Sequence, residues 1–264
     1  MSNTFIVVEG QPDVEFVAAL LEAEGYKKVV MVAELGDHFC DRLIVRSFPY
    51  KGDLHRRVPN PMFLWSGANW IAIQAAGGAT PELVKTARNG LMALQPFPGI
   101  LSAIGIVRDA DDGPAEKSFG NLRMELASNI RVDGYEITIP SNPGAISQGN
   151  PRLGIFILPD NAAEGTLEDL LLECGESAYP NLISGSQTFV SGVDIDHLKG
   201  KDAILIKKPT GKKKAVFACA ANILKPGMSI ATSIDQNNWL NDDTRELPRV
   251  KSLNEFLTRL CGIG

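Results

Sequence analysis

Residues 100–113 read ILSAIGIVRDADDG, an apolar run that changes abruptly into a run of acids. The part up to Val107 has the composition of a strand that is buried on both faces, as strands in parallel sheets are. Asp109 and Asp111 follow it, separated by Ala110. Because side chains alternate along an extended backbone, the two aspartates should point the same way. This segment therefore predicts a parallel sheet with paired carboxylates at a strand end.

The order of strand, turn and helix recurs on both sides of this segment. Residues 5–8 form an apolar strand that ends at Glu9, and Pro12 then opens a stretch with helical spacing. Residues 28–33 are predicted to be a second strand, which would complete a right-handed β-α-β unit. Further strands are expected at residues 70–73, 135–139 and 154–158, and helices from residue 80, at 114–128, from 167 and at 253–260. We therefore expect an α/β protein with a mostly parallel sheet flanked by helices.

Two parts of the chain lack this regular alternation. Residues 36–66 contain three prolines and little periodicity, which predicts a loop-rich insertion. The pattern is also less regular after residue 175. We expect a core of residues 1–175 and a C-terminal appendage of residues 176–264 that packs on the same core.

The composition is that of an ordinary globular chain. Its 264 residues are 44% hydrophobic and 22% charged, which suffices for one large core. Four cysteines without a CxxC pair favour a reducing compartment over a disulfide framework. No apolar run is long enough to span a bilayer and no early segment resembles a signal peptide, so we expect a cytoplasmic protein without a membrane partner.

The formal net charge of −5 excludes a general DNA-coating protein, because such binding depends on many lysines and arginines. The charge is compatible with a site in which metal ions bridge carboxylates to phosphates. Nucleic acid therefore remains a candidate partner.

The carboxyl ends of parallel strands share one edge of a sheet, where α/β proteins bind ligands. Glu9 should therefore lie near Asp109 and Asp111. Carboxylate oxygens are the ligands that Mg²⁺ prefers, and two such ions could support phosphodiester cleavage. A single acid at a strand end is more often a solvated turn residue, so the prediction depends on the whole set.

Four short blocks of the sequence together resemble the Toprim domain. They are Val8-Glu9-Gly10 with Asp13, then Gly77-Gly78, then residues 107–111, and finally Pro159, Gly165 and residues 167–169. The signature of that domain is a glutamate after one strand and DxD after another. The last block is similar to the Toprim domains of the overcoming-lysogenization-defect nucleases and of a small stand-alone family, mostly from prokaryotes.

This resemblance implies a Toprim-like fold and a Mg²⁺ or Mn²⁺ site that acts on nucleic-acid phosphodiesters, as in a nuclease. The positions that match its metal ligands are Glu9, Asp13, Asp109, Asp111 and Glu168. Glu9 could also be the general base. Asp13 and Glu168 would each lie in a first helical turn, where an acid is favourable without any metal. No GxxxxGK[ST] motif occurs, so an ATPase would have to be a separate protein partner.

Lys212, Lys213 and Lys214 come directly before the apolar stretch at residues 215–224, and they lie at a helix N-terminus if that stretch is a helix. Cations at a helix N-terminus oppose the helix dipole, so one interpretation is an exposed loop. The other is a catalytic lysine that stabilises charge on the phosphate, as a late lysine does in the related nucleases. Lys214 is the candidate because it adjoins the apolar stretch.

Three functions fit these observations. The first is a Toprim-type metal-dependent nuclease, and the second is a catalytically silent Toprim-like module that binds a nucleotide or a protein. The third is a glycosyltransferase of the DxD type, which would need a nucleotide-sugar pocket beside Asp111.

Overall fold

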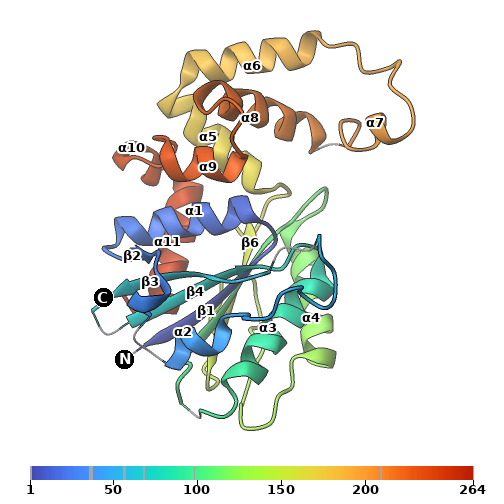
Figure 1. The fold of residues 1–264 in the computed structure, drawn as a ribbon. Coiled ribbons are helices and arrows are strands. Elements are labelled where there is room, and N and C mark those ends of the chain that lie inside the picture. Colours follow the sequence, from blue (N-terminus) through green and yellow to red (C-terminus); the bar gives the residue numbers. More distant parts are fainter. Residues whose placement is uncertain are drawn as a thin grey trace.

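A mostly parallel sheet lies at the centre of the protein (Figure 1). The computed structural model describes residues 2–35, 38–55, 58–67, 69–97, 99–208 and 210–263. Over these residues the sheet consists, in spatial order, of β2 (Lys27–Val29), β3 (Met62–Ser66), β4 (Asn69–Ala75), β1 (Asn3–Val8), β5 (Ala103–Asp109) and β6 (Arg152–Leu158). The strands β4, β1, β5 and β6 are parallel, so their carboxyl ends share one edge. The predicted α/β class is confirmed.

Helices cover both faces of the sheet. One hydrophobic core contains residues of α1 (Gln11–Ala23), α5 (Leu167–Ala178), α6 (Pro180–Gly192), α8 (Gly211–Leu224), α9 (Ile230–Gln236) and α11 (Pro248–Cys261). The core on the opposite face contains residues of α2 (His38–Leu43), α3 (Thr80–Leu94) and α4 (Ala115–Asn129). The other helices described are η1 (Val32–Glu34), α7 (Lys201–Ile204) and α10 (Asp242–Arg245).

The central strand β1 shows why the strands are continuous apolar runs. Ile6 and Val8 belong to the core beneath α1 and α11, whereas Phe5 and Val7 belong to the core beneath α3. Since successive side chains of a strand point to opposite faces, a strand covered on both faces must be apolar throughout. Among the described residues, no helix combines the length and the apolar composition that a membrane span requires.

The predicted first β-α-β unit is wrong in its second strand. β2 lies at the edge of the sheet and pairs antiparallel with β3, which in turn pairs antiparallel with β4. The hairpin of β3 and β4 places β4 beside β1, so β2 cannot reach that position. Val30 and Met31, expected to be in the strand, lie beyond it and are 84% and 61% exposed. The strand expected at residues 135–139 is also absent, and an isolated bridge joins Glu136 to Asn150 there.

Regular elements occur in both segments that lack a clear pattern. Residues 36–66 contain α2 and β3 in their described part. The segment after residue 175 contains α11, which packs directly on the sheet at two glycines. A Cβ atom at Gly105 would lie 2.6 Å from Leu260 Cδ2, and one at Gly154 would lie 2.9 Å from Phe256 Cζ. α11 therefore shares the core of residues 1–175, whereas α6, α7 and α8 lie farther from the sheet (Figure 1).

Candidate active site

Side chains from five separate positions of the chain converge at the carboxyl edge of the parallel strands. Glu9 follows β1, Asp13 lies in the first turn of α1, and Asp109 ends β5. Glu168 and Lys214 lie in the first turns of α5 and α8. They line an open pocket of about 370 Å³ together with Gly10, Pro12, Gly77, Gly78 and Leu167. Most of the residues predicted for the site are therefore in contact with one cavity.

The turn between β1 and α1 holds both Glu9 and Asp13 in place. The N–H of Gly77 donates to the Glu9 carbonyl at 3.0 Å, which extends the pairing of β1 with the chain after β4. Asp13 Oδ2 accepts from the N–H of Gly10 at 3.0 Å and so caps the start of α1. Its other oxygen, Oδ1, is buried without a hydrogen-bond partner. The capping role and a ligand role are thus compatible, because they use different oxygens.

Asp109 joins β5 to the start of α5. Its Oδ1 accepts from the N–H of Leu167 at 2.9 Å, and its carbonyl accepts from the Ser118 hydroxyl at 2.9 Å. The residue is only 7% exposed. Its carboxylate is therefore fixed at the N-terminus of α5, where an anion is favourable.

Asp111 does not continue the predicted alternation with Asp109. Its φ of 61° lies in the left-handed region, and its backbone forms a bridge with Gly165 through two hydrogen bonds of 2.9 Å. The side chain is 58% exposed and lies 3.9 Å from Arg108 Nη2. Asp111 is therefore at the margin of the pocket and is not among the residues that line it.

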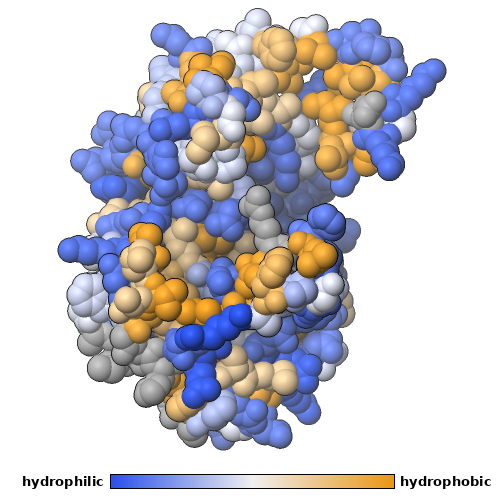
Figure 2. Space-filling model, in the orientation of Figure 1, coloured by the Kyte–Doolittle hydropathy of each residue, from blue (hydrophilic) through white to orange (hydrophobic). Residues whose placement is uncertain are grey.

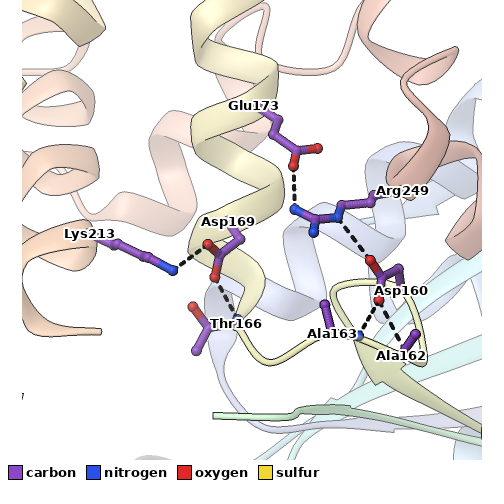
Figure 3. Close-up of polar contacts among 8 residues, drawn as sticks. All are labelled: Asp160, Ala162, Ala163, Thr166, Asp169, Glu173, Lys213 and Arg249. Carbon is purple, nitrogen blue, oxygen red and sulfur yellow. Dashed lines mark hydrogen bonds and ion pairs between the residues drawn. The ribbon is translucent and has the colours of Figure 1, made fainter. Parts of the chain in front are cut away.

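The lysines of the run lie in the first turn of α8, opposite the first turn of α5. Lys213 Nζ donates to Asp169 Oδ1 at 2.6 Å, while Asp169 Oδ2 accepts from the N–H of Thr166 at 2.9 Å (Figure 3). Lys214 Nζ lies 3.7 Å from Glu168 Oε1. The apolar stretch at residues 215–224 is helical, and the helix begins at Gly211, so the run is not a loop. The acids of α5 offset the unfavourable placement of cations at this helix end.

Arg108 is a site residue that the sequence did not reveal. Its Nε lies 3.5 Å from Glu9 Oε1, and it also donates to Thr80 Oγ1. It is 8% exposed, although it lies within β5. The available signal was a charged residue in an apolar strand immediately before DxD, since such a charge is buried only when it is paired.

Three carboxyl groups of the pocket, those of Glu9, Asp13 and Asp109, are harder to ionise than usual. Burial raises the pKa of Glu9, against the opposing effect of Arg108. Burial and the charge of Glu9 raise the pKa of Asp13 to about 7, and burial and Asp13 hold the pKa of Asp109 well above its usual range. Burial disfavours the charged form of Lys214, but Glu168 and the other acids outweigh it and raise its pKa. The pocket therefore holds more negative potential than its cations offset.

The chemistry of these side chains suits a hard divalent cation. Asp13 Oδ1 and Glu168 Oε2 are buried without a hydrogen-bond partner, and Glu9 Oε1 is buried with the ion-pair contact to Arg108 in place of a hydrogen bond. Burying a carboxylate oxygen without a hydrogen bond costs free energy, and coordination to Mg²⁺ or Mn²⁺ would offset this cost. Among the residues that the structure describes, no three or more His, Cys, Asp or Glu side chains are arranged to hold a metal ion as they stand. Ligation would require Glu9 and Glu168 to turn away from Arg108 and Lys214.

The fold and pocket define an α/β protein with an acidic pocket at the carboxyl edge of its parallel strands. Residues 3–262 match the model of a family described as a protein of unknown function, DUF3226, and the chain belongs to this family. No curated protein matches the sequence.

Among solved structures, the chain is similar to the crystal structure of a hypothetical protein from Pyrococcus horikoshii OT3. The TM-score is 0.51 and the identity 15%, with 98% of this chain and 95% of that chain covered. At this identity the similarity shows the fold.

Proposed function

We propose that this protein is a Toprim-type enzyme that uses Mg²⁺ or Mn²⁺ to hydrolyse nucleic-acid phosphodiesters. The observation that supports this most is the convergence of Glu9, Asp13, Asp109 and Glu168 with Lys214 in one pocket. They come from four separate parts of the sequence, and each of the four acids is a position at which the chain resembles the Toprim nucleases. Asp111, at the margin, would complete the set.

The four pocket carboxylates would hold the cation. When bound, a divalent cation supplies Lewis acidity that makes water a better nucleophile and offsets the charge of the phosphate. Glu9 is suited to accept the proton of the attacking water, because its raised pKa makes its carboxylate a stronger base. Gly77 and Gly78 leave the opposite rim without side chains, where a phosphate could approach the backbone.

Lys214 would stabilise the charge that develops on the phosphate. Its ammonium is now held by Glu168 at 3.7 Å. If Glu168 turns toward a cation, the ammonium becomes available to a phosphate oxygen in the same pocket. One movement of Glu168 would therefore supply a ligand to the cation and release Lys214 for the phosphate.

The test is cleavage of labelled single-stranded and double-stranded DNA and RNA with Mg²⁺ or Mn²⁺. Glu9→Gln should lower the rate at least about tenfold, the smallest effect expected for loss of a ligand or general base. Glu176→Gln, an exposed change on α5, is the matched control and should leave the rate unchanged. If the wild type cleaves none of these substrates with either ion, the enzyme proposal is wrong.

A catalytically silent module is the second candidate, and the contact between Arg108 and Glu9 favours it. The guanidinium of Arg108 beside Glu9 can take the place of a metal ion. A silent module predicts no heat of Mn²⁺ binding and no cleavage, together with binding of a nucleotide or protein. An enzyme predicts both Mn²⁺ binding and cleavage.

Two further expectations belong to this proposal. We propose a cytoplasmic location, which the free thiols of Cys174, Cys219 and Cys261 support. We also propose that any ATPase that assists the reaction is a separate protein, since the chain contains no GxxxxGK[ST] motif.

A further inference from the structure

Positive charge is concentrated in one part of the chain, residues 180–224, which we call the basic arm. It contains seven lysines and three aspartates and has neither arginine nor glutamate, which gives a net charge of +4. The rest of the chain contains 19 lysines and arginines against 28 acids, a net charge of −9. Such an asymmetry within one protein is typical of a surface that attracts a polyanion.

The basic arm consists of α6, α7 and α8, which lie outside the main sheet. α6 and α8 lie side by side, and the segment with α7 lies at their far end (Figure 1). The turn before α8 is tight: the N–H of Gly211 donates to the Lys208 carbonyl at 2.9 Å. A Cβ atom at Gly211 would lie 2.1 Å from the Leu205 carbonyl oxygen, so the α7 segment packs closely on the start of α8.

This packing connects the basic arm to the pocket. Lys214 lines the pocket, and Lys213 is bound to Asp169 beside it. Lys212 lies on the same turn of α8, and Lys208 lies one tight turn earlier. The basic arm therefore begins at the candidate active site with Lys214 and Lys213, and its backbone leads back through Lys212 and Lys208 to α7, which contains Lys201.

The outer lysines are available to a ligand. Lys201, Lys208 and Lys212 are exposed. In the part of the chain that the structure describes, ion pairs between lysines of the arm and acids involve Lys213 and Lys214. Lys207 has a structural role instead, since its Nζ donates to the carbonyls of Asp196 and Leu198 at 3.4 Å.

We infer that the basic arm binds the sugar-phosphate backbone of the nucleic acid whose phosphodiester enters the pocket. This inference rests on the proposed function, because the nucleic-acid strand that the arm would bind is the one that flanks the cleaved bond. A polyanion fits better than a small anion, since the cations are spread along a surface. Apolar and hydrophilic residues are mixed at the outer end of the arm (Figure 2). Ile204 and Leu205, 58% and 69% exposed, could contact sugars or bases there.

The experiment compares two triple variants that change the net charge equally. One is Lys201→Ala, Lys208→Ala and Lys212→Ala in the basic arm. The control is Arg88→Ala, Arg123→Ala and Arg131→Ala, three exposed residues of the α3 and α4 face. Binding is measured by fluorescence anisotropy with labelled DNA and RNA of about 20 nucleotides, single and double stranded, in EDTA at several salt concentrations.

The arm variant should bind at least about tenfold more weakly at low salt, and its salt slope with duplex DNA should be shallower by about 2–3. The control should bind like the wild type. Equal weakening in both variants would show a general charge effect and overturn the inference, as would a wild type that binds none of the probes.

Failure of the enzyme proposal is distinguishable from failure of this inference. Binding is measured in EDTA, in which metal-dependent cleavage cannot occur, so the two proposals are tested by separate measurements. Loss of binding in the arm variant without any cleavage by the wild type supports the arm and contradicts the enzyme. Unchanged binding in the arm variant, with a changed molecular mass in light scattering for Ile204→Ser with Leu205→Ser, would assign the arm to protein contacts and overturn the inference.

Discussion

Asp13 combines a capping role with an unsatisfied oxygen in the pocket. One of its oxygens caps α1 through Gly10, while the other is buried without a partner. Burial and the nearby charge of Glu9 raise its pKa from 3.8 to about 7. At neutral pH, folding without a cation therefore opposes ionisation of this side chain.

We predict that the metal-free protein becomes less stable as the pH rises toward neutrality. Between pH 3.8 and about 7 the folded state retains the Asp13 proton that the unfolded chain loses, so the free energy of unfolding falls. From pH 4 to pH 8 the fall should be on the order of 4 kcal/mol, at about 1.4 kcal/mol per pKa unit. Urea titrations in EDTA measure it. Asp13→Asn, which keeps an oxygen for Gly10, should flatten this dependence, and a dependence that stays equally steep would contradict the assignment.

Asp109 and Asp111 should differ in their effect on cation binding. Asp109→Asn should weaken the Mn²⁺ affinity strongly, since Asp109 is buried in the pocket, while Asp111→Asn should weaken it less. The double variant should remain folded or become more stable, because clustered acids repel one another without metal. Calorimetric titration with Mn²⁺ ranks the three variants. Unchanged affinity in the double variant would remove both residues from the site.

At the residue scale, spacing predicted which acids would meet but not how they would point. Glu9 and Asp109 were predictable because parallel strands align their carboxyl ends. The outward turn of Asp111 was not, since a left-handed φ is unusual for a residue other than glycine and DxD does not encode it. Arg108 was missed because a buried cation in a strand is apparent only once its partner Glu9 is in view.

At the scale of elements, Arg249 of α11 connects three parts of the structure. Its Nε donates to Asp160 Oδ2 at 3.0 Å and its Nη1 to Glu173 Oε1 at 2.5 Å (Figure 3). Asp160 in turn accepts from the N–H groups of Ala162 and Ala163, in the loop that leads to α5. Arg249 thus fixes the helix that carries Glu168 into the pocket.

We predict that Arg249→Met loosens this loop. It should cost about 1–3 kcal/mol of stability, because two partly buried carboxylates lose a charged hydrogen-bond donor. Hydrogen exchange of residues 160–169 should also become faster. Arg245→Met is the control, since Arg245 pairs with the highly exposed Asp242, and it should change stability by less than about 1 kcal/mol. Equal effects of the two substitutions would contradict a special role for Arg249.

Elements with a strong local pattern were predicted well, and weak ones were not. β1, β5 and β6 are long apolar runs, and α5 has helical spacing after a recognisable start at Thr166. β2 has three residues and depends on the hairpin of β3 and β4 for its place, which local sequence does not specify. Residues 135–139 alternate like a strand but find no partner strand beyond one bridge.

At the scale of the whole molecule, α11 belongs to the centre of the protein although it comes near the end of the chain. Leu253, Phe256, Leu257 and Leu260 are fully buried in the core that α1 and the sheet share. Local sequence predicted this helix but not where it docks, because that depends on Gly105 and Gly154 leaving room for it.

We predict opposite effects of two Gly→Ala substitutions. Gly154→Ala should destabilise the protein by about 1–3 kcal/mol, because the new methyl group would overlap Phe256 and Leu260. Gly120→Ala on α4 has open space and should stabilise it by about 0.5–1 kcal/mol through helix propensity. Denaturant titrations of both variants measure this. A neutral Gly154→Ala would show that α11 is loosely docked.

The contact between the start of the chain and α11 also affects how the protein folds during synthesis. The hydroxyl of Ser2 donates to the Cys261 carbonyl at 3.4 Å across a sequence separation of 259 residues. Contacts between residues so far apart in the sequence form slowly, since the entropy of closing the loop is lost before the packing energy is gained. Until α11 leaves the ribosome, the apolar side chains of Ile6 and Phe156 lack their final cover. Nascent chains should therefore depend on chaperones that shield this surface, and stalled translation before residue 248 should yield aggregates rather than a partly working protein.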